Sequence, residues 1–181
     1  MRYLALLVIL VATLPAQAQD DQQPARYYNR TSTGILVGGE PRYLTGGVTT
    51  IHGISVGPLA MGIGVGIEGY QRWRTVPIFG SLSYHPGDTR ESGPFIQLNM
   101  GHTNCKFLPE QESIRVDGRD WGFMFSTLAG YQIAAGKLLV NFSAGYQKQK
   151  LRAKYSAGLA FVSYTLEEEA DRFVFKIGVG M

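Results

Sequence analysis

The chain has 181 residues, a formal net charge of +3 and 45% hydrophobic residues, and its length fits a single domain. Its 23 glycines follow no collagen repeat, and its 10 tyrosines and 9 phenylalanines exclude intrinsic disorder. One cysteine excludes an intrachain disulfide framework and a cysteine zinc cluster. The small net charge gives no reason to expect a nucleic-acid partner.

Residues 1–18 are typical of a secretory signal peptide. Arg2 supplies the positive end, residues 4–14 form an apolar run, and Ala16-Gln17-Ala18 is the small-x-small pattern after which cleavage is expected. The apolar run is shorter than the roughly 20 residues of a membrane-spanning helix. Residues 19–30 are predicted to form a short polar leader.

Residues 31–181 repeatedly alternate between apolar and small or polar side chains, which is the pattern of β-strands. In the segment 61–68, the odd positions are Met, Ile, Val and Ile, whereas the even positions are Gly, Gly, Gly and Glu. No window shows a convincing helical period of 3.6 residues. Eight strands are predicted, at 31–38, 47–57, 61–72, 75–85, 94–103, 120–133, 137–155 and 163–181.

The segment 47–57 fits this pattern least well. Its even positions are the more apolar ones, but they include His52. Either this assignment of faces is wrong, or a β-bulge changes the phase of the strand. The sequence leaves the face of this strand undecided.

The predicted connections alternate in length. Short ones are expected at 57–60, 86–93 and 134–136, and longer ones at 39–46, 104–118 and about 150–168. We call the two ends of the sheet the short-turn end and the long-loop end. Cys105 falls in a predicted long loop and is interpreted as an incidental thiol. Eight strands with this alternation predict an all-β, eight-stranded antiparallel up-and-down transmembrane β-barrel.

The last two strands support this prediction through their register. If Val140 lies opposite Val179, the apolar positions of the two strands face one another and the charges pair with opposite signs further along. Four cations then share one strand face, and three of them oppose acids. They are Lys148 opposite Asp171, Lys150 opposite Glu169, Arg152 opposite Glu167, and Lys154 opposite Thr165. Pairing is the favoured interpretation, and binding of lipopolysaccharide phosphates is the alternative.

The second face of the strands carries small and amide side chains, which suit a narrow, filled lumen. A soluble calycin-like barrel, with its apolar face inside, is the less favoured alternative. Buried polar side chains need partners, so a hydrogen-bonded lumen network is expected. Its predicted members are Glu68, Arg72, Gln97, Asn99, Gln132, Asn141 and Lys176.

Aromatic residues gather where membrane interfaces are expected. The short-turn end has Tyr84 and Tyr131, and the long-loop end has Trp73, Trp121, Tyr146 and Phe173.

No catalytic, cofactor-binding or metal-binding residue is predicted, and the chain is not expected to be an enzyme. The three histidines lie on different predicted strands, which gives no local pair of metal ligands. A lipid A-modifying enzyme is a weaker alternative. Its local candidates would be His102-Thr103-Asn104, and Ser83 with His85, but neither forms a recognisable nucleophile–base–acid pattern.

The mature sequence resembles small outer-membrane β-barrel proteins of Gram-negative bacteria, the OmpA/OmpX-like class. The resemblance is carried by the Ala-Gln-Ala-Gln ending of the signal peptide, the strand 62–66, and the terminal pattern Phe173-x-Phe175-x-Ile177. Many members end in Phe, whereas this chain ends in Met181.

The chain is predicted to be a monomer in the outer membrane, in contact with membrane lipids. Its hairpin at about 148–171 is expected to project as a sheet edge, which could bind a surface protein by β-augmentation. The resemblance implies that such a protruding sheet acts in adhesion or envelope integrity. A narrow channel for small solutes is the main alternative function.

Overall fold

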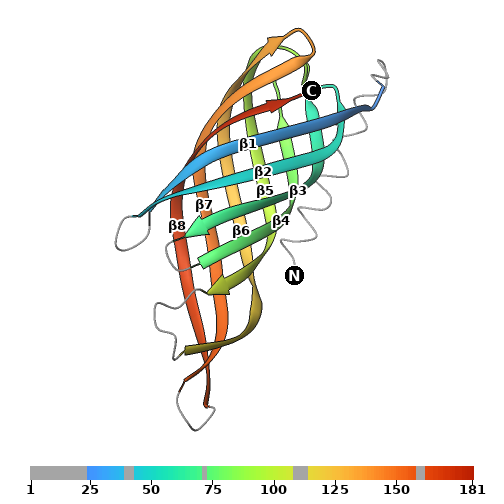
Figure 1. Ribbon diagram of the computed structural model, residues 1–181. Coiled ribbons are helices and arrows are strands. Elements are labelled where there is room, and N and C mark those ends of the chain that lie inside the picture. The colour runs from blue at the N-terminus through green and yellow to red at the C-terminus, as the bar shows by residue number, and fades with distance from the viewer. Residues whose placement is uncertain (1–23, 39–42, 71–72, 108–113, 158–161) are drawn as a thin grey trace, which may run out of the picture.

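The computed structural model describes residues 24–38, 43–70, 73–107, 114–157 and 162–181. Eight antiparallel strands each pair with their neighbour in sequence, and β1 pairs with β8 to close a barrel (Figure 1). No helix in these ranges is long and apolar enough to cross a membrane. The strands are β1 Arg26–Gly38, β2 Tyr43–Val56, β3 Leu59–Tyr70, β4 Trp73–Tyr84, β5 Gly93–Phe107, β6 Ile114–Ala135, β7 Leu138–Ala157 and β8 Val162–Gly180.

The register predicted for the last hairpin is confirmed. Val140 of β7 lies opposite Val179 of β8, and Lys148 lies opposite Asp171 further along the same ladder. The apolar pairs and the charged pairs therefore follow one another without a register shift. The turn predicted near Gly158 lies outside the described residues.

Several strands are longer than the apolar alternation predicts. β1 begins at Arg26, so residues 26–30, which were expected in the leader, form part of the barrel. β5 continues to Phe107 and β6 begins at Ile114, so much of the loop predicted at 104–118 is strand. In the added residues of β1, polar side chains occur on both faces, and at the end of β5 they point outward while Cys105 is buried. The outer face is therefore not apolar in these two stretches, and the alternation of a membrane-spanning strand is missing there. The predicted signal peptide lies outside the described residues.

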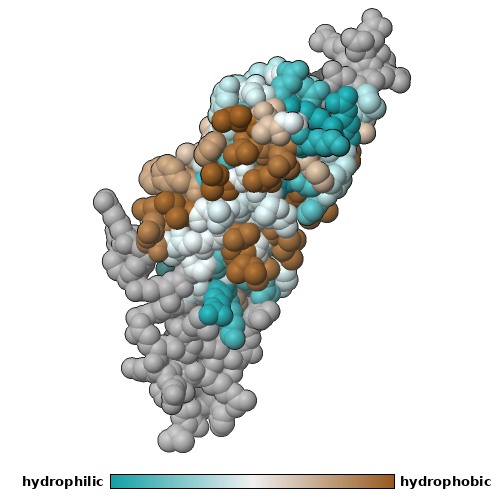
Figure 2. All heavy atoms as spheres, turned by 45° about the horizontal axis from the view of Figure 1, so that its top comes forward, coloured by the Kyte–Doolittle hydropathy of each residue, from teal (hydrophilic) through white to brown (hydrophobic). Residues whose placement is uncertain are grey.

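The apolar faces of the strands point outward. Large hydrophobic side chains at these positions are exposed, for example Ile63 at 71% and Ile67 at 67%. Figure 2 shows hydrophobic residues gathered across the middle of one face, with the most hydrophilic ones toward the ends of its coloured part. A water-soluble barrel would bury such side chains, so the calycin-like alternative is wrong and the barrel is a transmembrane barrel.

The even-numbered face of the segment 47–57 also points outward. Val48, His52 and Ile54 are all exposed, whereas Thr49 and Ile51 are buried. The ladders of β2 with β1 and with β3 are continuous, so no bulge changes its phase.

Two tight hairpins lie at the short-turn end. Gly57 between β2 and β3 has a φ of 54°, and Gly136 between β6 and β7 has a φ of 67°. Both angles lie in the left-handed region, which glycine adopts without steric cost.

The lumen contains apolar as well as polar side chains. Trp73, which was predicted at the outer interface, is buried at 3% exposure and packs inside the barrel. Cys105, predicted in a loop, lies in β5 and is fully buried beside it. Of the other predicted interface aromatics, Trp121, Phe173, Tyr84 and Tyr131 are exposed, and Tyr146 is half-buried. Trp73 and Cys105 pack with Leu151 and Ala170 toward the long-loop end.

Candidate functional site

A hydrogen-bonded network surrounds Arg30 near the short-turn end of the lumen. Its guanidinium donates from Nη1 to Oε1 of Gln97 at 2.7 Å and from Nη2 to Oε1 of Gln132 at 3.4 Å. The amide of Gln97 donates to Oδ1 of Asn99 at 2.8 Å, and the amide of Asn99 donates to Oγ of Ser126 at 2.9 Å. Three predicted lumen residues are therefore joined in one network, and Arg30 lies at its centre.

The turn 85–92 is anchored to this network. Nε2 of Gln132 donates to the backbone carbonyl of Thr89 at 2.8 Å and to that of Glu91 at 2.7 Å. Both Gln132 and Thr89 are buried. The connection between β4 and β5 is thus held by lumen side chains, and it helps to fill the barrel at this end.

The side chain of His85 in this turn predicts a pH dependence. Burial lowers the pKa of His85 to about 4, with a further contribution from the charge of Arg30, while Asp88 acts in the opposite direction. A lowered histidine pKa means that the folded state favours the neutral ring, so stability is full above about pH 6.5 and declines as the pH falls toward 4. We expect the thermal unfolding temperature to fall across this window.

The matched control for this prediction is His85→Phe, which preserves an aromatic ring beside Phe95, 5.3 Å from the His85 ring. This variant should lose the decline in unfolding temperature between pH 6.5 and 4. An equal decline in the variant would contradict the assignment to His85.

A second network lies toward the long-loop end. Nε2 of Gln147 donates to a carboxylate oxygen of Glu68 at 2.9 Å and lies 3.4 Å from Oε1 of Gln149. Nε2 of Gln149 donates to Oγ1 of Thr103 at 2.7 Å. These side chains are buried, so the amide of Gln147 takes the place of water as a donor to the Glu68 carboxylate.

Glu68 and Lys176 approach one another across two glycines. In the register, Lys176 lies opposite Gly34, Gly34 opposite Gly47, and Gly47 opposite Glu68, along four neighbouring strands. A Cβ atom at Gly34 would lie 2.7 Å from Cγ of Lys176, and one at Gly47 would lie 2.9 Å from Cγ of Glu68. The two long side chains therefore lie flat over the glycines, and Nζ of Lys176 reaches Oγ1 of Thr49 at 3.4 Å.

Two other predicted lumen residues do not join these networks in the described structure. Asn141 is buried, but its amide atoms have no hydrogen-bond partner there. Arg72 lies outside the described residues. Sequence reasoning missed Arg30 because it falls in the predicted leader, and it missed the partners Gln147 and Gln149. The odd-numbered polar face of β7, which includes Gln147, is the signal that could have identified these two.

Three of the four candidate cations of β7, namely Lys148, Lys150 and Arg152, lie on the membrane-facing side of the strand, beyond its apolar part. Nζ of Lys148 lies 2.9 Å from Glu169 and 3.9 Å from Asp171, and Nζ of Lys150 lies 3.1 Å from Glu169. Arg152 contacts Glu167 at 3.0 Å, and the backbone of Lys154 lies opposite Thr165. Three cations of β7 thus form ion pairs with acids of β8 in this hairpin.

These ion pairs predict an acid-sensitive hairpin. Hydrogen bonds from Lys148 and then Lys150 hold the pKa of Glu169 below its ordinary value of 4.5. A lowered carboxyl pKa stabilises the hairpin above about pH 4.5, and this contribution is lost as the pH falls through the lowered value. Backbone amide exchange of β7 and β8 beyond the membrane, corrected for intrinsic rates, should accelerate in acid. A Glu169→Gln variant should show less of this acceleration, and an identical pH response would contradict the prediction.

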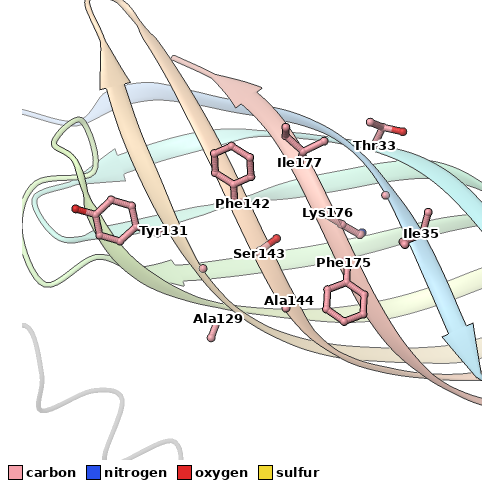
Figure 3. A pocket seen from close by; sticks show the side chains of 12 residues that line it. Thr33, Ile35, Ala129, Tyr131, Phe142, Ser143, Ala144, Phe175, Lys176 and Ile177 are labelled. Carbon is pink, nitrogen blue, oxygen red and sulfur yellow. The ribbon is translucent and has the colours of Figure 1, made fainter.

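A shallow hollow of about 740 Å³ lies on the membrane-facing surface between β6, β7, β8 and β1. The small side chains of Ala129 and Ala144 lie between larger neighbours such as Tyr131, Phe142 and Phe175 (Figure 3). Ala129 and Ala144 are opposite one another in the ladder, so two adjacent strands are short of side-chain volume at the same level.

The local catalytic candidates do not assemble as pairs. His102 is exposed on the outer face of β5, whereas Thr103 is buried in the lumen. Ser83 and His85 are both buried, and Nε2 of His85 has no hydrogen-bond partner among the described residues. Within the same residues, no cluster of three or more histidine, cysteine or acidic side chains could hold a metal ion.

The sequence matches no protein-family model and no curated protein. Its fold is similar to that of Neisserial surface protein A, with a TM-score of 0.60 and 10% identity over 87% of this chain and 98% of that one.

Two further structures have lower TM-scores. Outer membrane protein AlkL gives 0.49 at 16% identity, over 92% of this chain and 93% of that one. Outer membrane protein OprG from Pseudomonas aeruginosa gives 0.48 at 14% identity, over 88% and 95%. The chain thus has the architecture of a small outer-membrane β-barrel, with eight antiparallel strands closed by β1 and β8.

Proposed function

We propose that the chain is a monomeric protein of the Gram-negative outer membrane that interacts with other molecules at the cell surface. The apolar outer face and the likeness to Neisserial surface protein A support the location. In such barrels the short turns face the periplasm. The long-loop end then faces outward, where the barrel contacts a partner in adhesion or envelope integrity.

The observation that carries this proposal is the edge of β8. β1 pairs with β8 only as far as Gly38 opposite Arg172, whereas β7 pairs with β8 out to Val162. Among the described residues, no strand pairs with the second edge of 162–171. An unpaired edge presents backbone donors and acceptors to an added strand, which supports β-augmentation by a surface protein.

A hairpin deletion tests this function. Replacing residues 152–167 by a short turn keeps the transmembrane ladder but removes most of the free edge. The control exchanges Lys148, Lys150 and Arg152 with the opposing Asp171, Glu169 and Glu167, which reverses the charges and keeps the edge. Adhesion of cells expressing each variant, with heat-modifiable gel mobility as the folding check, is the measurement.

The deletion should abolish adhesion and the charge exchange should retain it. Adhesion that survives the deletion would overturn the proposal. Adhesion that is lost in both variants would show that charge, and not the strand edge, makes the contact.

The filled lumen supports an interaction role over a solute channel. Side chains around Arg30 and Glu68 occupy both halves of the barrel interior. Purified protein in planar bilayers should therefore show no steady single-channel openings, and such openings would favour the channel.

Lipopolysaccharide binding by the β7 cations is less favoured, because the acids of β8 neutralise three of them. Neutralising Lys150, Arg152 and Lys154 together should leave lipopolysaccharide co-purification unchanged.

A further inference from the structure

A row of hydrogen-bonded polar side chains crosses the membrane-facing surface of β1 and β2. Nδ1 of His52 lies 2.5 Å from the hydroxyl of Tyr27, and Nε2 of His52 lies 3.1 Å from Oγ1 of Thr50. Oγ1 of Thr50 lies 3.0 Å from Oγ1 of Thr31. We call these four residues the His52 relay. It explains how an imidazole is accommodated on the apolar face of β2.

The relay begins at the short-turn boundary of the membrane. Tyr27 follows Arg26, whose guanidinium lies 3.7 Å from Asp88 in the turn 85–92, and such charges stay close to water. Thr31 lies four residues beyond Tyr27 along β1. With a rise of about 3.4 Å per residue and a tilt near 45°, the relay extends roughly 10 Å into the bilayer. This depth includes the level of the ester bonds of membrane phospholipids.

The surroundings of the relay are apolar. In the two ladders, His52 lies opposite Ile63 of β3, and Thr31 lies opposite Val179 of β8. Ionisable and hydrogen-bonding side chains are unfavourable on a membrane-facing surface, and where they occur they usually mark a functional site. Mutual hydrogen bonding accounts for the stability of the relay. It does not account for the selection of histidine over an apolar residue.

The four side chains are arranged in the sequence nucleophile, general base and orienting residue that is typical of an acyl-transfer site. When Nδ1 of His52 carries the ring proton, it donates to the oxygen of Tyr27, and Nε2 accepts the proton of the Thr50 hydroxyl. Thr50 is then a nucleophile beside a general base, and Tyr27 fixes the ring and its tautomer. Thr31 places a second hydroxyl within 3.0 Å of the nucleophilic oxygen, where it can donate to a developing oxyanion.

We propose that the His52 relay cleaves ester bonds of glycerophospholipids in the leaflet at the short-turn end. Oγ1 of Thr50 attacks the ester carbonyl while Nε2 of His52 takes its proton. Collapse of the tetrahedral intermediate breaks the ester C–O bond, and His52 returns the proton to the departing glycerol oxygen, which releases a lysophospholipid. Water, deprotonated by His52, then attacks the acyl–Thr50 ester, releases a fatty acid and restores the hydroxyl.

This site differs from the pairs suggested by the sequence. Those pairs involved His85, which is buried in the turn 85–92, and His102, which is exposed on β5. The substrate suggested for them was lipid A. The relay instead lies at the short-turn end, which faces the periplasm in the proposed orientation. Phospholipids of that leaflet are therefore the substrate class that can reach Thr50.

The experiment uses the full mature barrel in nanodiscs of phosphatidylethanolamine and phosphatidylglycerol, with lysophospholipid and fatty acid release followed by mass spectrometry. Thr50→Val and His52→Ala should each reduce release by at least about 100-fold. Thr50→Ser keeps a hydroxyl nucleophile and should retain release. Tyr27→Phe should lower kcat and leave KM nearly unchanged, because Tyr27 positions the imidazole ring of His52 and does not bind the lipid.

Thr33→Val is the matched control. Thr33 is an exposed threonine on the same strand face, but its hydroxyl donates to the carbonyl of Gly47 at 3.3 Å and lies outside the relay. Release should be unchanged in this variant, and all variants should show the folded, heat-modifiable form. Release by the wild-type protein that is no greater than release by Thr50→Val would overturn the proposal. Equal loss in Thr33→Val and Thr50→Val would also overturn it.

Discussion

Gly122→Ala is expected to prevent normal folding of the barrel or to destabilise it by at least about 4 kcal/mol. A Cβ atom at Gly122 would lie 1.6 Å from the backbone carbonyl oxygen of Lys150 and 2.6 Å from its carbonyl carbon. These are main-chain atoms of β7, so a rotamer change cannot relieve the overlap. The β6–β7 ladder shifts register between Arg119 and Met124, and Gly122 lies within this irregular stretch.

Heat-modifiable gel mobility and urea titration of the refolded protein in detergent measure this effect. Gly80→Ala is the matched control, because Gly80 is also a strand glycine but its nearest neighbour would lie 3.8 Å from the new Cβ. The control should fold with nearly unchanged stability. A Gly122→Ala variant that folds as well as Gly80→Ala would contradict the close approach of β6 and β7.

Glu68→Leu is expected to reduce the free energy of unfolding by about 3–5 kcal/mol. The substitution removes the acceptor of the 2.9 Å hydrogen bond from Gln147. It also removes the negative charge that lies across Gly34 and Gly47 from Lys176. The buried amide of Gln147 would lose its acceptor and the half-buried ammonium of Lys176 would lose its opposing charge at the same time, which makes the loss larger than that of a single neutral hydrogen bond.

A double-mutant cycle separates these two effects. Lys176→Met alone should also destabilise the barrel, whereas the double variant should lose less than the sum of the two single variants. The loss in free energy of unfolding that remains in the double variant measures the cost of leaving the Gln147 amide without its acceptor. Strict additivity of the two substitutions in urea titrations would show that the charges of Glu68 and Lys176 are not coupled.

The membrane-spanning part of the fold is predictable because a bilayer imposes a strict rule: the side chains on the lipid-facing side of each strand must be apolar. In β7 and β8 the apolar positions from Val140 to Tyr146 and from Phe173 to Val179 have a single register that keeps all of them in lipid. Beyond this zone the rule no longer applies. Part of the loop predicted at 104–118 is strand in the structure. Strands that pair in water do not need an apolar outer face, so the sequence pattern of a membrane strand is missing there.

The arrangement of the lumen is less predictable from sequence. Its side chains are selected by their contacts with one another, whereas the outer side chains are selected by a uniform lipid environment. Gln97, Asn99 and Gln132 were identified from their face, but Arg30 was hidden in a segment without apolar alternation. Trp73 was assigned outward because tryptophan prefers membrane interfaces, whereas space beside the small Ala170 lets its ring lie inside. Such choices depend on which strands face one another across the barrel, and a single strand does not contain that information.

The pairing of β1 with β8 has a consequence for how the chain reaches its folded state. It joins the two ends of the described sequence, as in Thr33 opposite Ile177, so the barrel closes through the strand contact of longest sequence separation. Contacts of such sequence separation make folding slow, and the incomplete barrel exposes two unpaired edges in the meantime. A chaperone or an insertion machine that covers these two edges would protect the barrel from aggregation until its final strand arrives.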